Sequence, residues 1–439
     1  MKPTGALSRE AGLANPIGTL PTAPAAEGRV LASGMGLIAG RVASMGLGFA
    51  MWLIAARLFE PAQVGIASGL VSAMMLCVQL ALLGIGAAAI ASYPAHQASP
   101  SRLLNSGALA VVVTGLGAAI AFLLLAGLGL EELRVAISPA YAAAFLAMVV
   151  FGTLNTFYDH ASIALHRGEQ VLVRNTLFGL VSIGGILLAS QLVDVRGSLA
   201  VLAAWSAAAI GACLLAVVQL RATVPSFRFR AAIDLGIVRE LVRAGVPNWL
   251  LTLTERAPAL VLPILVTELL SPTTNAFWYA VWMMGWVVLI VPISIGQTLF
   301  AEATQRPDAI SPAVRRAVRS SLVLGLIAAG GLAIVAEVAL GLLGPAYAAA
   351  GATPLRVLVA SVIPVSVIQV YYAVCRARSA LGEAIATGAA AGITALAVTL
   401  VGGALAGLFG MAVGWLAVQA LAGIWAALRI RSLMADGSG

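Results

Sequence analysis

Long apolar segments, separated by short polar ones, follow one another along almost the whole chain. Each approaches or exceeds the roughly 20 residues that an α-helix needs to cross about 30 Å of hydrocarbon. The alternating pattern of membrane β-barrel strands is absent from the sequence. The pattern therefore predicts an all-α integral membrane protein with about twelve transmembrane helices. The predicted helices span residues 30–57, 62–91, 104–130, 139–165, 175–193, 198–220, 246–269, 275–301, 318–343, 354–376, 381–404 and 407–428.

The composition agrees with a membrane protein. Of the 439 residues, 61% are hydrophobic and 10% are charged, whereas soluble domains contain about 45–50% apolar and about 25% charged residues. The three cysteines, Cys77, Cys213 and Cys375, all fall inside predicted helices and have no CxxC spacing. We therefore interpret them as packing residues and expect neither a disulfide nor a metal site.

The Lys and Arg residues fall mainly on one side of the predicted membrane. Of the 25, 19 lie on the side of the N-terminus and four on the other, and Arg41 and Arg256 lie inside helices. Cytoplasmic loops carry the excess of positive charge, so the pattern predicts a multi-pass protein of the inner (plasma) membrane with both termini in the cytoplasm. The net charge of +8 then reflects topology and contact with anionic membrane lipids, and does not indicate a nucleic-acid partner.

Two pairs of similar sequences indicate an internal duplication. The hexapeptide PAYAAA occupies residues 139–144 and 345–350, an offset of 206. LFEP at 58–61 and LLSP at 269–272 have an offset of 211. Both pairs occupy corresponding outer positions if helices 1 to 6 and 7 to 12 are two copies. Because each copy has an even number of helices, the two lobes share one orientation and are related by a pseudo-two-fold axis along the membrane normal.

The repeat divides the chain into an N-terminal lobe (30–220) and a C-terminal lobe (246–428). Residues 1–29 are predicted to form a disordered cytoplasmic tail, and residues 429–439 a short cytoplasmic tail. Between the lobes, residues 221–245 form a basic cytoplasmic connection whose apolar positions recur at helical spacing. We expect this connection to lie along the membrane surface, the alternative being a solvated linker.

No predicted loop is large enough to hold an active site. The sequence also contains no GxxxxGK[ST], HExxH or GxSxG motif. We therefore expect transport instead of enzymatic chemistry, and no cofactor.

Three segments resemble a known family. Residues 36–88 are similar to the first two helices of bacterial polysaccharide flippases, which are joined by a short AR-L-x-P-x-x-x-G turn. Residues 275–303 resemble the eighth helix of these proteins, and residues 342–361 the loop into the tenth. On these segments the chain is identified as a member of the multidrug/oligosaccharidyl-lipid/polysaccharide flippase superfamily, in its polysaccharide transporter branch, to which O-antigen flippases belong.

The resemblance implies two six-helix lobes that face each other across a central cavity, which opens to either side of the membrane in turn. Such proteins carry a polyprenyl-diphosphate-linked oligosaccharide to the outer leaflet for the synthesis of cell-surface polysaccharide such as lipopolysaccharide. The resemblance also implies polysaccharide-assembly proteins as partners. Two alternatives stay open: a cation-coupled multidrug exporter of the same superfamily, and a scaffold for envelope assembly that transports nothing.

Charged residues inside the membrane are costly and are therefore candidates for function. Arg41 lies about 16 Å deep in helix 1, and Glu255 and Arg256 lie roughly 14–15 Å deep in helix 7, at 1.5 Å per residue. If both arginines face one cavity with Glu255 between them, their forked guanidinium groups can bind a diphosphate. The alternative is that these charges neutralise neighbours inside the helix bundle.

Two further groups are weaker candidates. Trp278, Trp282 and Trp286 recur every four residues on helix 8, and such rings either stack on sugars or pack in the protein. Asp159 and His160, near the inner end of helix 4, either relay a proton that couples transport or form a pair at the membrane boundary that water reaches. For the substrate site we select Arg41, Arg256, Glu255, Trp282 and Trp286.

The predicted topology can be tested by labelling introduced cysteines. Ser311→Cys is expected to react with a membrane-impermeant reagent only after the inner membrane is permeabilised, and Thr273→Cys without this treatment. The opposite pattern would overturn the orientation.

Overall fold

The structure, a computed structural model, describes residues 40, 43–191, 197–224, 227–230, 233–305 and 310–435. These residues form helices and connecting turns, and no strand occurs among them. A first helix (Ala43–Leu58) is followed by α2 (Pro61–Ala81), α3 (Ile85–Ser92), the 3₁₀ helix η1 (Tyr93–His96), α4 (Pro100–Gly129), the 3₁₀ helix η2 (Glu132–Ile137), α5 (Pro139–Ala164), α6 (Gly168–Ala189), α7 (Ser198–Thr223), α8 (Leu235–Leu269), α9 (Pro272–Gln305), α10 (Ile310–Gly341), α11 (Pro345–Val359), α12 (Val362–Ala377) and α13 (Leu381–Ala435).

The helices agree with the predicted spans. In the part of the chain that the structure describes, nine helices are long and apolar enough to cross a membrane, and α11 with α12, bent by 46° at their junction, makes a tenth span. The 55-residue α13 contains non-helical backbone at Ala406 and Gly407, where the sequence predicts a boundary between two spans. A Cβ atom at Gly402 would lie 2.3 Å from the carbonyl oxygen of Gly410, so α13 folds back on itself as a helical hairpin. With the first helix included, each of the twelve predicted spans has a counterpart.

The duplicated sequences mark corresponding helix starts. Pro61 and Pro272 are the first residues of α2 and α9, and Pro139 and Pro345 are the first residues of α5 and α11. Proline suits this position because its ring fixes the helical φ angle and the first turn needs no amide donor. The repeats therefore begin equivalent helices in the two halves, as expected for a duplicated fold.

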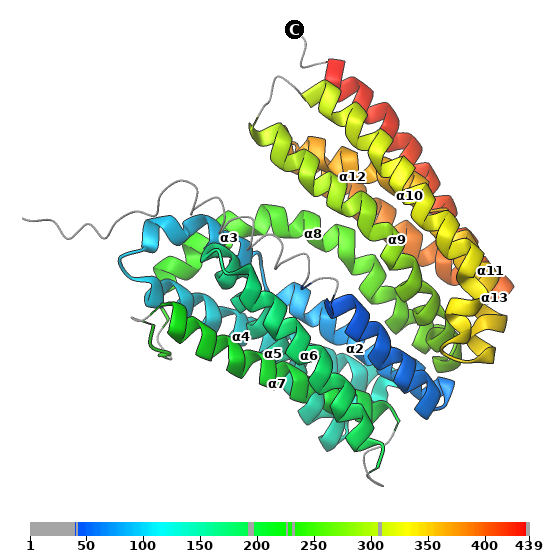
Figure 1. The fold of residues 1–439 in the computed structure, drawn as a ribbon, viewed down its shortest axis with the longest axis horizontal. Coiled ribbons are helices and arrows are strands. Elements are labelled where there is room, and N and C mark those ends of the chain that lie inside the picture. Colours follow the sequence, from blue (N-terminus) through cyan, green and yellow to red (C-terminus); the bar gives the residue numbers. More distant parts are fainter. Residues whose placement is uncertain are drawn as a thin grey trace, which may run out of the picture.

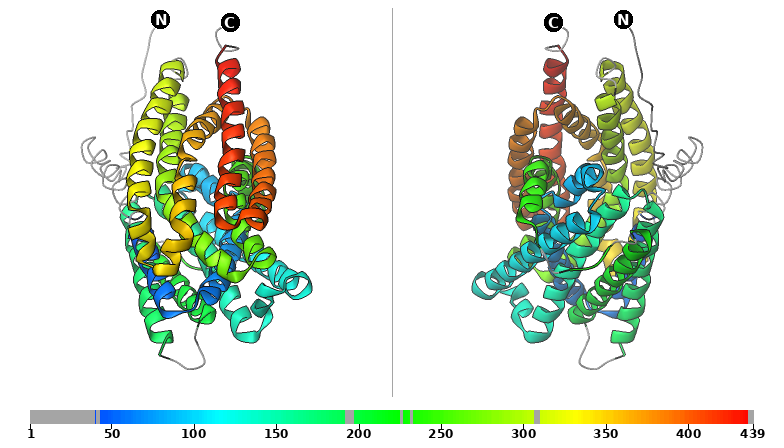
Figure 2. Two further views of the ribbon diagram at one scale, coloured as in Figure 1. Left: turned by 90° about the vertical axis from the view of Figure 1, so that its right-hand side faces the viewer. Right: turned by 90° about the vertical axis from the view of Figure 1, so that its left-hand side faces the viewer.

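The two lobes meet at one end of the molecule and diverge toward the other (Figure 1). The joined end holds the starts of α2, α9 and α11, and the diverging end holds the end of α13. Figure 2 shows the end of α9, the start of α10 and the end of α13 at this same diverging end. The positive-inside pattern predicts that the diverging end faces the cytoplasm.

Helix α8 belongs to both lobes. At its N-terminal end, Leu241 packs in a core cluster with residues of the first lobe, whereas Leu251 packs with residues of the second lobe. The segment 235–245, predicted as part of the connection between lobes, thus forms the first turns of a long transmembrane helix. The helix is capped by Asp234, whose carboxylate accepts hydrogen bonds from the amides of Gly236 and Ile237 and pairs with Arg102 of α4. The hydrogen bond from the Ile237 amide is the main interaction that lowers the pKa of Asp234.

Helix α8 crosses the junction between α2 and α3 at two glycines, Gly245 and Gly84, which are in contact. A Cβ atom at Gly245 would lie 2.4 Å from the carbonyl oxygen of Gly84, a distance that no side chain permits. At this crossing the α2–α3 pair is broken, because Leu83 and Gly84 both have left-handed backbone, with φ of 45° and 75°. The break and the glycine contact give the two lobes a crossing point at which backbone touches backbone.

Candidate functional site

The candidate site is the face of α8 that is directed toward α2. The indole N–H of Trp249 donates to the carbonyl of Gln79 in α2 at 2.7 Å. Thr267 lies 18 residues, or five helical turns, beyond Trp249 and contacts α2 at Gly69, where a Cβ atom would be 2.9 Å from its hydroxyl. Arg256, seven residues after Trp249, lies on the same face by helical periodicity. Arg256 is exposed between these two contact points.

The neighbouring carboxylate faces the second lobe. Glu255 accepts a hydrogen bond of 2.7 Å from Arg376 in the last turn of α12, and each of the two side chains is only 16% exposed. The sequence places Arg376 at the cytoplasmic end of its helix and does not predict this pair. Two arginines and one glutamate therefore lie close together in the second lobe, with a local balance of +1. The other predicted cation, Arg41, lies outside the described residues.

Asp159 also binds an arginine. Arg174 of α6 donates to the Asp159 carboxylate at 2.6 and 3.1 Å and to Gln219 at 2.6 Å, and its side chain is only 1% exposed. The sequence predicts Arg174 just before a span that starts at 175, whereas α6 begins at Gly168 and carries it into the bundle. His160 lies beside this pair, and its Nδ1 is 2.8 Å from the carbonyl oxygen of Thr156 one turn earlier.

The three predicted tryptophans lie side by side along α9, with ring centroids 6.1 Å apart for Trp278 and Trp282 and 6.3 Å apart for Trp282 and Trp286, but their surroundings differ. Trp278 is fully buried and Trp282 is 9% exposed, and the Trp282 ring packs 4.7 Å from the ring of Trp415 in α13. Trp282 thus packs in the core, away from the exposed residues of α8 and α9. Trp286 differs, because it lies seven residues after Tyr279, whose ring is 4.9 Å from Trp52 of the first lobe. Trp286 therefore lies on the side of α9 that faces the first lobe.

Uncharged polar residues continue both the side of α9 that faces the first lobe and the α8 face of Arg256 toward the diverging end. Gln297 lies five turns after Tyr279 on α9, Thr304 continues the same line, and both are exposed. On α8, Asn248 and Thr252 precede Arg256 by two turns and one turn, and Asn248 is exposed. The prediction from sequence considered intramembrane charges and missed these residues. The helical spacing could have identified them: Gln297 lies 18 residues after Tyr279, and Asn248, Thr252 and Arg256 follow one another every four residues.

At the joined end, polar contacts close the space between the lobes. Asn275 of α9 donates to the carbonyl of Gly65 at 2.9 Å and to the hydroxyl of Ser68 at 3.0 Å. Glu268 of α8 accepts hydrogen bonds of 2.7–3.2 Å from three consecutive backbone amides at the start of η2, those of residues 131–133. Arg57 in the last turn of the first helix donates to the carbonyls of residues 341 and 342 at the end of α10. These bonds connect lobe to lobe and contribute to keeping this end shut.

Comparison with known proteins agrees with this architecture. A family model described as polysaccharide biosynthesis protein matches residues 30–300. No curated protein sequence matches the chain.

Solved structures share the fold. An outward-facing multidrug resistance MATE family transporter of the MOP superfamily is 13% identical, with 92% of this chain and 96% of that chain covered and a TM-score of 0.66. An inward-facing structure of such a transporter is 14% identical, with 89% and 95% covered and a TM-score of 0.63. A MOP superfamily transporter from Pyrococcus furiosus, described as having a binding pocket of reverse polarity, is 13% identical, with 92% and 96% covered and a TM-score of 0.62. The family match confirms the predicted polysaccharide family, and the likeness to the solved structures confirms the predicted two-lobed fold.

The Glu255–Arg376 pair can be tested by a double-mutant cycle. Glu255→Gln and Arg376→Met are each expected to lower the free energy of unfolding by about 3 kcal/mol, because each leaves one charge without its partner. The double variant should lose roughly 2 kcal/mol less than the sum of the single losses. Denaturant unfolding of the purified protein in detergent measures these values. Additive losses would show that the two side chains do not stabilise each other.

Proposed function

Because the chain belongs to the polysaccharide biosynthesis protein family, we propose that it carries a polyprenyl-diphosphate-linked oligosaccharide across the bacterial inner membrane. The cargo would serve the synthesis of cell-surface polysaccharide, such as the glycan of lipopolysaccharide. The observation that carries the proposal is the exposed Arg256 on the α8 face between the lobes, in line with exposed polar residues that lead to the diverging end.

The cargo needs such a path. A hydrated sugar diphosphate enters hydrocarbon only at great cost, because its charges and hydroxyl groups lose their water. Arg256 supplies a guanidinium fork that matches phosphate oxygens. Asn248, Gln297 and Thr304 offer donors and acceptors for sugar hydroxyls, and Trp286 offers a ring face for stacking. We propose Arg41 as a second phosphate ligand, contributed by the first lobe.

The arrangement of the lobes supports alternating access. The polar contacts of Arg57, Glu268 and Asn275 close the joined end, while the lobes diverge at the arginine-rich end (Figure 1). In the proposed orientation this state opens to the cytoplasm, where the lipid-linked glycan is made. We propose that the lobes turn about the Gly84–Gly245 crossing, so that the joined end opens as the other end closes.

Cation-coupled drug export is the alternative function, and the fold likeness to multidrug transporters supports it. An exporter of this kind needs an intramembrane carboxylate that a cation can reach. Asp159 and Glu255 each bind an arginine instead, so the paired state of these carboxylates favours the flippase.

Arg256→Ala is expected to reduce glycan export about tenfold or more, because a hydrogen bond to a charged group contributes about 1.5–3 kcal/mol. Arg256→Lys should recover part of the export, since an ammonium keeps the charge but loses the fork. The measurement is restoration of surface polysaccharide in a flippase-deficient host, normalised to the amount of protein in the membrane.

Arg319→Ala is the matched control, because Arg319 is also exposed but lies near the start of α10, outside the α8 face. The control is expected to export normally. Full export by Arg256→Ala at normal abundance would remove Arg256 from the proposed path. Restoration of drug resistance without any glycan export by the wild-type protein would instead identify an exporter.

A further inference from the structure

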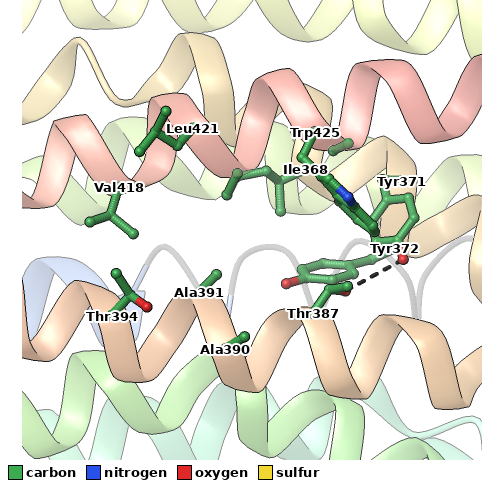
Figure 3. A pocket seen from close by; sticks show the side chains of 12 residues that line it. Ile368, Tyr371, Tyr372, Thr387, Ala390, Ala391, Thr394, Val418, Leu421 and Trp425 are labelled. Carbon is green, nitrogen blue, oxygen red and sulfur yellow. Dashed lines mark hydrogen bonds between the residues drawn. The ribbon is translucent and has the colours of Figure 1, made fainter.

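A slot of about 300 Å³ lies within the second lobe, separate from the α8 face, because no residue of the first lobe or of α8 lines it. The two halves of α13 form its walls and α12 contributes Ile368, Tyr371 and Tyr372 (Figure 3). Alanines 390, 391 and 422 line the walls, and these small side chains leave the space between the helices open. Leu421 and Trp425 at its edge are 68% and 40% exposed, so the slot opens at the surface of the lobe.

The slot is closed by polar groups at one end only. Arg429 donates to both oxygens of Glu383, at 2.7 and 2.8 Å, and so joins the two halves of α13 near the diverging end of the molecule. The Tyr371 hydroxyl donates to the same carboxylate at 3.1 Å and lies 3.4 Å from the hydroxyl of Thr387. Beyond this pair the lining is mostly apolar, with the hydroxyl groups of Tyr372 and Thr394 as its other polar groups. The slot is therefore amphipathic along its length.

Positive charge surrounds the polar end. Arg376, Arg378, Arg429 and Arg431 lie in the last turns of α12 and α13 or just after them. The carboxylates paired with them are Glu255 and Glu383, and Arg378 donates to the carbonyl of Leu433. Four positive and two negative charges leave a local balance of +2. Basic groups between transmembrane helices on the cytoplasmic side bind anionic head groups.

From the apolar lining and this charge, we infer that the slot binds one acyl chain of an anionic phospholipid of the cytoplasmic leaflet. The phosphate lies beside the arginines at the polar end, and the chain follows the slot between the two halves of α13. A volume of about 300 Å³ is at the lower end for ligand pockets, which suits one chain and excludes a glycan. The inference does not depend on the proposed function, since the slot is separate from the face that carries Arg256.

A bound chain would brace the α13 hairpin. The two halves touch directly at Gly402 and Gly410 and are joined again by Glu383 and Arg429. They also touch where a Cβ atom at Gly414 would lie 2.8 Å from the carbonyl oxygen of Val398, and between that contact and the Glu383–Arg429 pair the slot lies between the two halves. A lipid chain there supplies packing that the small alanine side chains do not provide.

The test is native mass spectrometry of the full chain purified in detergent and exposed to phosphatidylglycerol or phosphatidylcholine, with thermal unfolding recorded in parallel. The wild type is expected to retain one phosphatidylglycerol and to unfold at a higher temperature with it than with phosphatidylcholine. Ala391→Phe, which fills the slot, should lose the bound lipid and the increase in unfolding temperature. Ala404→Phe makes the same change at an exposed position of the same helix, outside the slot, and should behave as the wild type.

Arg431→Gln keeps the slot open and should retain phosphatidylglycerol no better than phosphatidylcholine. This second variant tests the inference even if Ala391→Phe fails to fold. Retention of phosphatidylglycerol by Ala391→Phe at the wild-type level would overturn the inference. Equal retention of both lipids by the wild type, or displacement of phosphatidylglycerol by a polyprenyl phosphate, would overturn it as well.

Discussion

Contact between backbones, permitted by glycine, ties the two lobes together, and the candidate site depends on it. At the joined end, Gly65 of α2 lies so close to the start of α9 that a Cβ atom would be 1.8 Å from the carbonyl oxygen of Pro272. Toward the other end, Gly84 and Gly245 meet in the same way. Small residues permit such close approach in membranes, where the hydrophobic effect contributes little to helix association. Because α8 runs from one lobe to the other between these contacts, its polar face lies at the boundary between the lobes.

The positions of the charged residues inside the transmembrane helices show how each charge is satisfied. A charge inside the membrane has to be paired or has to face water or a ligand. Asp159 and Glu255 satisfy this requirement within their own lobes through Arg174 and Arg376. Arg256 lies on the exposed face of α8 beside the Glu255 pair. The cation that the proposed function uses is thus exposed on α8, next to a carboxylate–arginine pair that is largely buried.

Much of the fold was predictable from the sequence, since hydrophobic runs of helical length and prolines at corresponding helix starts are local features. The partners of the intramembrane charges were not. Arg174 and Arg376 lie near predicted span boundaries, where an arginine is expected to face water, and only tertiary packing carries them to Asp159 and Glu255. The continuation of α8 into the predicted connection also depends on packing against the first lobe. Helical periodicity places Trp282 and Trp286 on nearly the same side of α9, so only the tertiary contacts of Trp282 with Trp415 and of Tyr279 with Trp52 distinguish their surroundings.

The claim that the lobes turn about the α2–α8 crossing is tested most directly by two distances measured by electron paramagnetic resonance. One pair of spin labels is placed at the diverging end, at the exposed residues Gln97 after η1 and Ser311 at the start of α10. The other pair is placed at the joined end, at the exposed residues Arg134 in η2 and Ala346 at the start of α11. Both pairs are introduced into a variant without the three buried native cysteines. Addition of lipid-linked oligosaccharide is expected to add a population in which the first distance is shorter and the second is longer. Two distances that stay unchanged, or that change in the same direction, would contradict the account.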